Sequence, residues 1–174
     1  MSWECPDPLR IDANLNSFID AYRDNYLRFF LERFQSDHRP GYRGGYFNIN
    51  SVTGKPHAHR CCFSWTDGRS LAELSICHLL ALGDREVTRE YAQHIRDALV
   101  ERWELNGYLP HVVDDATNRA TGDPLNVKIG PDGSSYSHMF VMNGLLQHDL
   151  IFTDAEAGEV GKTLFESLRD ALAR

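Results

Sequence analysis

Residues 64–87 read SWTDGRSLAELSICHLLALGDREV and contain the start of a helical hairpin. Apolar residues recur there at three- and four-residue steps, which predicts a helix from about Ser64. Ser64 and Asp67 are spaced as an acidic variant of a capping box, and Gly83 is predicted to close the helix. The stripe consists of Leu71, Leu74, Cys77, Leu80 and Ala81.

The next helix begins after a very short link, Asp84-Arg85. So short a connection forces two neighbouring helices to lie antiparallel. The sequence therefore predicts a helical hairpin, whose second helix has the stripe Val87, Tyr91, Ile95, Ala98 and Leu99.

Three further segments have the helical period. The first runs from about Asn14 to Phe34, another from about Ser135 to Phe152, and the last starts at Thr153-Asp154 and continues to the end of the chain. Their apolar positions are Leu15, Phe18, Ile19, Tyr22, Tyr26, Phe29 and Phe30, then Met139, Phe140, Met142, Leu145 and Leu146, then Val160, Leu164, Leu168 and Leu172.

Two long connections separate these helices, and they resemble each other. Tyr46–Phe63 favours a short β-hairpin or ordered loop, and residues 107–114 alternate weakly. Gly45-Tyr-Phe, Gly54-Lys-Pro and Asp67-Gly-Arg-Ser have counterparts in Gly107-Tyr-Leu, Gly122-Asp-Pro and Asp132-Gly-Ser-Ser, offset by roughly 62 to 68 residues. A unit of helix, long β-like loop and helix is therefore repeated.

Alternating short and long links predict an all-α toroid of helical hairpins with the β-like long loops at one rim, where binding residues gather. We expect residues 1–174 to form a single domain of about two and a half hairpins, too few for a closed ring.

Composition narrows the partners. The net charge is −7, with 18 Lys and Arg against 25 Asp and Glu, which argues against nucleic acid and favours neutral polar ligands. No apolar run is long enough to span a bilayer and no leader pattern precedes the first helix, so we expect neither export nor a membrane partner. The 4 cysteines are interpreted as reduced thiols of a cytoplasmic protein.

Trp65 and Arg69 are candidate binding residues. They are four residues apart at the start of a helix, so they share one face beside the long-loop rim. An Arg there can hold sugar hydroxyls or a developing oxyanion while the indole stacks on a pyranose face. The alternative is a surface Arg paired with Glu73.

Tyr136, His138 and Phe140 occupy the equivalent place on the helix that begins near Ser135. Tyr136 and Phe140 lie on one face, whereas His138 points away from them in a regular helix. A neutral His can donate and accept hydrogen bonds to a polyol, but a histidine with a structural role is the more common outcome.

No metal or cofactor is expected. His57, His59 and Cys61 would face one side of a strand, with Cys62 next to them, but no second ligand pair follows at the usual separation. Motifs for dinucleotides, nucleotide phosphates, serine hydrolysis and zinc proteolysis are absent from the sequence.

Several of these motifs, in this order, resemble the N-acylglucosamine 2-epimerase family of sugar epimerases and aldose–ketose isomerases. They are Gly44-Gly-Tyr-Phe, the turn Gly54-Lys-Pro, Trp65-Thr-Asp-Gly-Arg69 and Tyr136-Ser-His138-Met-Phe140. Asp67 stands where that family usually has Gln, and Met139 stands where it often has Ala.

The resemblance implies an (α/α)6 barrel, of which this chain is the N-terminal part, and interconversion of hexoses at C1 and C2 through an enediolate. By the matching motifs, Arg69 would hold substrate oxygens at the reacting end, and Trp65 and Tyr136 would line the pocket. The family's proton-transferring histidines lie in the second half of its barrel, so the isolated chain is expected to be inactive.

Two other functions remain open. A non-catalytic helical module would bind carbohydrate or assemble, with a homodimer or a C-terminal half completing the ring. A six-hairpin glycoside hydrolase or lyase ranks last, because the rim acids Asp67, Asp114 and Asp132 are typical of caps and turns.

Overall fold

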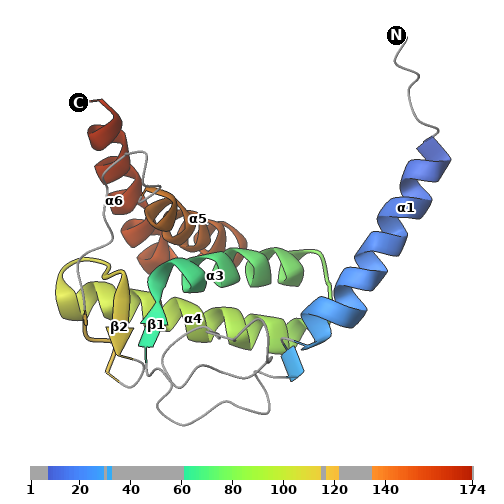
Figure 1. Ribbon diagram of the computed structural model, residues 1–174, viewed down its shortest axis with the longest axis horizontal. Helices are drawn as coiled ribbons and strands as arrows, with labels where there is room; N and C mark the ends of the chain where they lie inside the picture. Colours follow the sequence, from blue (N-terminus) through green and yellow to red (C-terminus); the bar gives the residue numbers. More distant parts are fainter. Residues whose placement is uncertain (1–7, 30, 33–60, 115–116, 122–134, 174) are drawn as a thin grey trace. The chain divides into compact units, whose positions relative to one another are not determined.

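The computed structural model describes residues 8–29, 31–32, 61–114, 117–121 and 135–173 (Figure 1). Of these residues, 79% are helical, and a two-stranded sheet accompanies the helices. The chain divides into two compact units, Met1–His38 and Arg39–Arg174, which are described separately below. The expectation of a single domain over the whole chain stays a prediction.

The first unit is a helix with an irregular middle. Helix α1 spans Pro8–Ala21, and a π-helix, η1, follows at Tyr22–Leu27. The helix therefore begins earlier than the expected Asn14, and Pro8 suits a first helical turn because its fixed φ is already helical and its missing N–H costs no bond there. Part of the predicted apolar stripe is solvent-exposed, at Leu15, Phe18, Tyr26 and Phe29.

The second unit contains the predicted hairpin. Helix α3 spans Ser64–Leu79 and helix α4 spans Arg85–Asn106. The Asp84 carboxylate accepts hydrogen bonds from the backbone N–H groups of Glu86 and Val87, at 3.0 and 3.1 Å, and so caps α4. Residues at the start of α3 contact residues near the end of α4, so the helices are antiparallel, as predicted.

The capping box predicted at Ser64 is wrong. The N-cap of α3 is Phe63, and the Ser64 hydroxyl donates instead to the Pro110 carbonyl at 2.6 Å. The Asp67 carboxylate forms an ion pair with Arg102 of α4. Both polar side chains are buried, so they take partners from the packed neighbour rather than from the helix's own first turn.

The end of α3 also differs from the prediction. Ala81, not Gly83, takes the left-handed position, with φ of 54°. The Leu82 N–H donates to the Cys77 carbonyl at 2.8 Å and the Ala81 N–H to the His78 carbonyl at 3.2 Å, which is the Schellman pattern. Gly83, with φ of 76°, lies in the turn that follows.

The sheet joins the last residues of the first long connection to the first part of the second. Strand β1, Cys61–Phe63, pairs antiparallel with β2, Val112–Asp114, and Cys62 lies opposite Val113. The rest of the hairpin expected at Tyr46–Phe63 lies outside the described residues. A strand at the end of the first connection therefore pairs with a strand in the second, and local sequence patterns do not encode such a contact between distant segments.

Helix α5 spans Ser135–Phe152 and α6 spans Ala155–Leu172, which confirms both predicted segments. Between them, Thr153 is left-handed with φ of 59°, and the Asp154 carboxylate caps α6 by accepting from the Ala157 N–H at 3.2 Å. The predicted α6 stripe is buried at Val160, Leu164 and Leu168.

Helices α3 and α5 lie side by side and parallel (Figure 1). The first turn of α3 meets the second turn of α5 at Trp65 and Phe140, and the last turns of both helices meet at His78 and Phe152. A Cβ on Gly68 would lie 2.5 Å from the Val141 Cα, so glycine permits the helices to cross this closely. Helix α5 packs in turn against α6, and α3 against α4.

The core of the second unit is formed where these helices pack. The buried apolar residues include Leu71, Leu74, Cys77, Tyr91, Ile95, Leu99, Leu109, Val113, Val141, Leu145, Val160 and Leu164.

Within the described residues, no helix combines the length and apolar character that crossing a bilayer requires.

Candidate functional site

Trp65, Arg69 and Phe140 form one cluster, which we call the aromatic–arginine site. The Trp65 and Phe140 ring centroids are 6.3 Å apart, with an interplanar angle of 38°. The Arg69 guanidinium carbon lies 5.3 Å from the centroid of the Phe140 ring, in a cation–π contact. The structure therefore brings together three of the residues that the sequence nominates, from two segments far apart in the chain.

Local sequence explains why these side chains meet. Trp65 and Arg69 are separated by one helical turn of α3, and Phe140 is in the second turn of α5. The Gly68 crossing sets the two backbones close enough for the rings to touch. Trp65 and Phe140 are half-buried, whereas Arg69 is exposed, so its guanidinium is accessible to a ligand.

Tyr136 lies in the first turn of α5, four residues before Phe140. Its backbone position therefore puts it on the Phe140 face of the helix. Its side chain lies outside the described residues, so its place in the pocket stays a prediction.

His138 is turned toward α6. Its side chain is buried, and Nε2 donates to the Leu164 carbonyl at 2.6 Å. Burial lowers the pKa of His138 below its ordinary value, against a smaller opposing effect of the hydrogen bond to Leu164. This contact is structural, and no sugar-binding role for His138 follows from it.

A buried polar network lies beneath the first turn of α3, and we call it the Asp67–Arg102 network. An Arg102 terminal nitrogen is 2.5 Å from an Asp67 carboxylate oxygen, and both side chains are almost fully buried. Arg102 Nε donates to Asn118 Oδ1 at 2.9 Å, and the same terminal nitrogen is 3.3 Å from the Ser64 hydroxyl. Asn118 donates to the Glu101 carboxylate at 2.8 Å.

The sequence interpretation missed this network. Asp67 resembled a cap, and an Arg near the end of a helix ordinarily points to solvent. One signal was available, because Arg102 continues the buried stripe of α4 three or four residues beyond Ala98 and Leu99. A charged residue at a stripe position indicates a buried partner.

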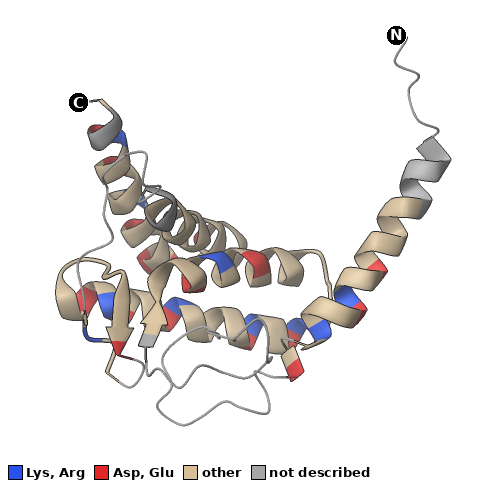
Figure 2. Ribbon diagram, in the orientation of Figure 1, with Lys and Arg blue, Asp and Glu red and all other residues tan. Residues whose placement is uncertain are grey.

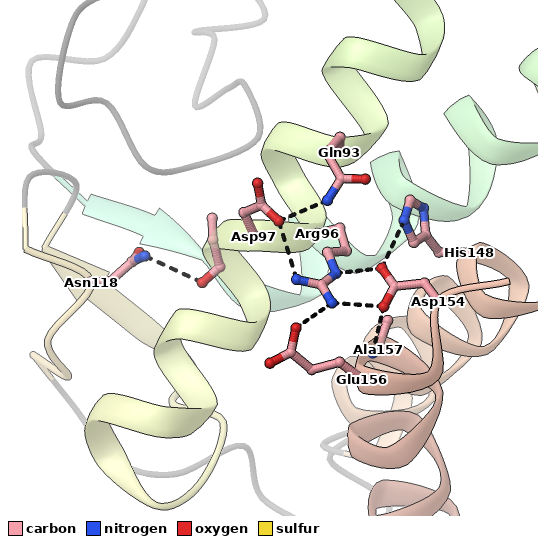
Figure 3. Close-up of polar contacts among 9 residues, drawn as sticks. Gln93, Arg96, Asp97, Asn118, His148, Asp154, Glu156 and Ala157 are labelled. Carbon is pink, nitrogen blue, oxygen red and sulfur yellow. Dashed lines mark hydrogen bonds and ion pairs between the residues drawn. The ribbon is translucent and has the colours of Figure 1, made fainter. Parts of the chain in front are cut away.

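A second polar cluster joins α4, α5 and α6 around Asp154 (Figure 3). Arg96 binds the Asp154 carboxylate through two nitrogens, at 2.5 and 2.6 Å, and reaches Glu156 at 2.5 Å. The buried His148 places Nε2 3.3 Å from an Asp154 oxygen. Because Asp154 also caps α6, one carboxylate fixes the start of that helix against the other two.

Electrostatics in this cluster follow from burial and pairing. Burial lowers the pKa of His148, and the nearby Asp154 carboxylate only partly opposes that effect. Burial alone would raise the pKa of Asp154, but hydrogen bonds from Arg96 and the Ala157 N–H outweigh it, so that pKa lies below its ordinary value. The cluster therefore contains an ionised pair beside a neutral imidazole, which is a structural arrangement.

The suspected metal ligands do not form a site that the structure describes. His57, His59 and the Cys61 side chain lie outside the described residues, and Cys62 is buried. In the part of the chain that is described, no group of three His, Cys, Asp or Glu side chains is arranged to hold an ion.

Figure 2 shows Lys and Arg interspersed with Asp and Glu along α4.

The aromatic–arginine site thus combines two half-buried aromatic rings with an exposed guanidinium that lies over one of them, near the start of two parallel helices. Such a surface suits a ligand with an apolar face and hydroxyl or anionic oxygens. Comparisons of the chain with protein-family models, with curated proteins and with solved structures find no match.

Proposed function

We propose that the aromatic–arginine site is part of the monosaccharide pocket of a sugar epimerase or aldose–ketose isomerase. The observation that carries the proposal is the meeting of Trp65, Arg69 and Phe140. These residues come from the two motifs that resemble the N-acylglucosamine 2-epimerase family.

The proposed chemistry assigns each residue a role. The C–H face of a hexose stacks on the Trp65 ring, while Arg69, held over the Phe140 ring, donates hydrogen bonds to the oxygens on C1 and C2. When a proton leaves the carbon next to the carbonyl, negative charge develops on those oxygens. A fixed guanidinium beside them stabilises the enediolate more than the neutral sugar, which lowers the barrier.

Proton transfer between C1 and C2 also requires a base. The proposal assigns none among the described residues, since His138 is engaged with the Leu164 carbonyl. The substrate is an unmodified or N-acylated hexose, and no cofactor takes part.

We also propose that α3–α6 are successive members of a partial (α/α)6 toroid. Two features support this arrangement. Helices α3 and α5 are parallel neighbours with α4 antiparallel between them in sequence, and β1 and β2 join the two long connections at the end where Trp65 and Phe140 lie.

A non-catalytic carbohydrate-binding module is the second candidate. The same three side chains serve binding without turnover, so the observation that carries the first proposal is equally compatible with this one. Of the three rim acids that a glycoside hydrolase could use, Asp67 is not available to a glycosidic oxygen, because it is buried against Arg102.

Sugar binding by variants tests the proposal. Arg69→Met and Trp65→Ala are each compared with Arg89→Met, a change at an exposed Arg of α4. Titration calorimetry with mannose, glucose, fructose and N-acetylmannosamine is expected to detect at least one ligand. The first two variants are expected to weaken binding about tenfold or more, and Arg89→Met to leave it unchanged.

The same samples are incubated with each sugar and the products are separated. Binding without product formation is expected, because the proposal assigns no base among the described residues, and turnover that Arg69→Met abolishes would show that this chain contains the base. If none of the four sugars binds the unaltered chain, or if Arg69→Met binds as tightly as the unaltered chain, the proposal is wrong.

A further inference from the structure

The Asp67–Arg102 network differs from an ordinary surface ion pair in its burial. The exposed fractions of the Arg102 and Asp67 side chains are 0% and 1%. Taking two charges out of water is costly, and the attraction between them offsets that cost only approximately. Global stability is therefore a weak explanation for a fully buried pair at this position.

The network connects three parts of the second unit at one point. Ser64 and Asp67 belong to the first turn of α3, Arg102 belongs to α4, and Asn118 belongs to the connection that follows β2. The Asn118 amide also donates to the Ala98 carbonyl at 3.2 Å. The first turn of α3 is consequently held to α4 by directional contacts as well as by apolar packing.

Helical geometry relates this attachment to the candidate site. Trp65 is two residues before Asp67 and Arg69 is two residues after it. At about 100° per residue, Trp65 and Arg69 each lie roughly 160° around the helix axis from Asp67. Both are therefore on the face of α3 opposite to Asp67. Holding Asp67 toward α4 therefore turns Trp65 and Arg69 away from α4, to the side where both contact Phe140 of α5.

We infer that Asp67 and Arg102 are positioning residues for the aromatic–arginine site. Their ion pair fixes the rotation of the first turn of α3 about its axis, so that the Trp65 ring and the Arg69 guanidinium face Phe140. The inference rests on the proposed function for its effect on sugar binding, but its effect on Trp65 can be measured without any sugar.

The test uses Trp65 as its own reporter. Replacing Trp3 and Trp103 by Phe leaves Trp65 as the fluorophore, since the chain has 3 Trp. The double variant D67L/R102M in this background removes both charges, so neither is left buried without its partner. Replacing a buried ion pair by apolar residues of similar volume is often neutral or stabilising in other proteins. A melting temperature within about 5 °C of the parent is expected.

The expected result is a shifted Trp65 emission maximum and at least twofold greater quenching by acrylamide, because the indole leaves its place against Phe140. Affinity for whichever of the four sugars binds the parent is expected to fall about tenfold. The matched control is R96M/D154S, which removes the largely buried ion pair between Arg96 and Asp154. A serine at position 154 can still cap α6. That variant is expected to leave Trp65 emission and sugar affinity unchanged.

A conservative variant keeps the inference open to refutation if D67L/R102M does not fold. Arg102→Lys retains a cation for Asp67 but loses the contacts with Asn118 and Ser64. It is expected to keep the parent's Trp65 emission. The inference is overturned if D67L/R102M folds with unchanged emission and quenching, or if Arg102→Lys folds with an altered emission. Absence of sugar binding by the parent would refute the proposed function alone, because the Trp65 signal still decides the positioning.

Discussion

Helices α3, α4 and α5 are each followed by a residue in the left-handed conformation, and the residues after α3 and α4 differ in having a Cβ. Ala81 follows α3 with φ of 54°, and Gly107 follows α4 with φ of 69°. For a residue with a Cβ this conformation costs roughly 1 kcal/mol, because the Cβ approaches the following carbonyl, whereas glycine adopts it without that penalty. The same backbone conformation is therefore occupied by an unfavourable residue, Ala81, after α3 and by a favourable one, Gly107, after α4.

We predict opposite effects of exchanging these residues. Ala81→Gly is expected to raise the free energy of unfolding by about 0.5–1 kcal/mol, and Gly107→Ala to lower it by about 1 kcal/mol. A Cβ on Gly107 meets no atom within 4 Å, so only backbone strain acts there. Urea unfolding followed by circular dichroism measures both changes, and a loss of stability in Ala81→Gly would contradict the left-handed end of α3.

Individual polar residues were the hardest to predict from sequence. The aromatic and Arg positions near the helix starts followed from helical spacing, which fixes the shared face of Trp65 and Arg69. The partner of Asp67 did not, because it lies on another helix, and a short polar side chain near a helix start equally suits a cap. His138 shows the same ambiguity, since its partner is the carbonyl of a residue in α6.

At the scale of helices, the crossings depend on glycines at two contacts. Gly68 of α3 faces the backbone of α5 around Val141, whereas a Cβ on Gly161 of α6 would lie 2.9 Å from Cγ and Cδ2 of Leu146 and 3.3 Å from its backbone nitrogen. Backbone atoms cannot move aside without moving the helix, whereas the end of a Leu side chain can adopt another rotamer. The same added methyl group therefore has different consequences at the two crossings.

We predict that Gly68→Ala lowers the free energy of unfolding by about 3 kcal/mol or more, because the two helices must separate. Gly161→Ala is expected to cost less than about 1 kcal/mol, since Ala also favours the helical conformation by nearly that amount. Urea unfolding of both variants gives the comparison. If the two variants lose equal free energy of unfolding, the close approach of the α3 and α5 backbones is not what makes Gly68 necessary.

The bounds of α5 were predicted from sequence, whereas the start of α1, the end of α3 and the pairing of the strands were not. Helix α5 has the predicted bounds, and the link at Asp84 gave the antiparallel hairpin, because helical period and capping are local properties. Strands β1 and β2 are three residues long and pair across α3 and α4, so no local pattern specifies their register. The crossing at Gly68 likewise depends on a neighbour distant in sequence.

For the whole second unit, acid sensitivity follows from two buried histidines. Burial lowers the pKa of His138 and of His148 below the ordinary 6.5, so the unfolded chain binds these protons more readily than the folded chain does. The resulting stability is fully present above about pH 6.5 and is lost as the pH falls from there through the folded-state values.

We predict that the free energy of unfolding decreases between pH 7.5 and pH 5, with a slope of at most about 1.4 kcal/mol per pH unit for each histidine. His148→Gln is expected to make that slope shallower by removing one of the two protons. Urea unfolding at several pH values measures the slope, and imidazole resonances in the folded protein report the pKa directly. A folded-state pKa of His148 above 6.5 would contradict this account of its burial.

The account as a whole depends on whether a sugar occupies the aromatic–arginine site, and the most direct measurement is a nitrogen-15 NMR titration of the unaltered chain with the four hexoses. The account predicts saturable shifts of the Trp65 indole N–H and the Arg69 guanidinium N–H, with the Trp103 indole of α4 unchanged. Saturation at Trp103 with Trp65 and Arg69 unmoved, or no saturable shift with any of the sugars, would contradict it.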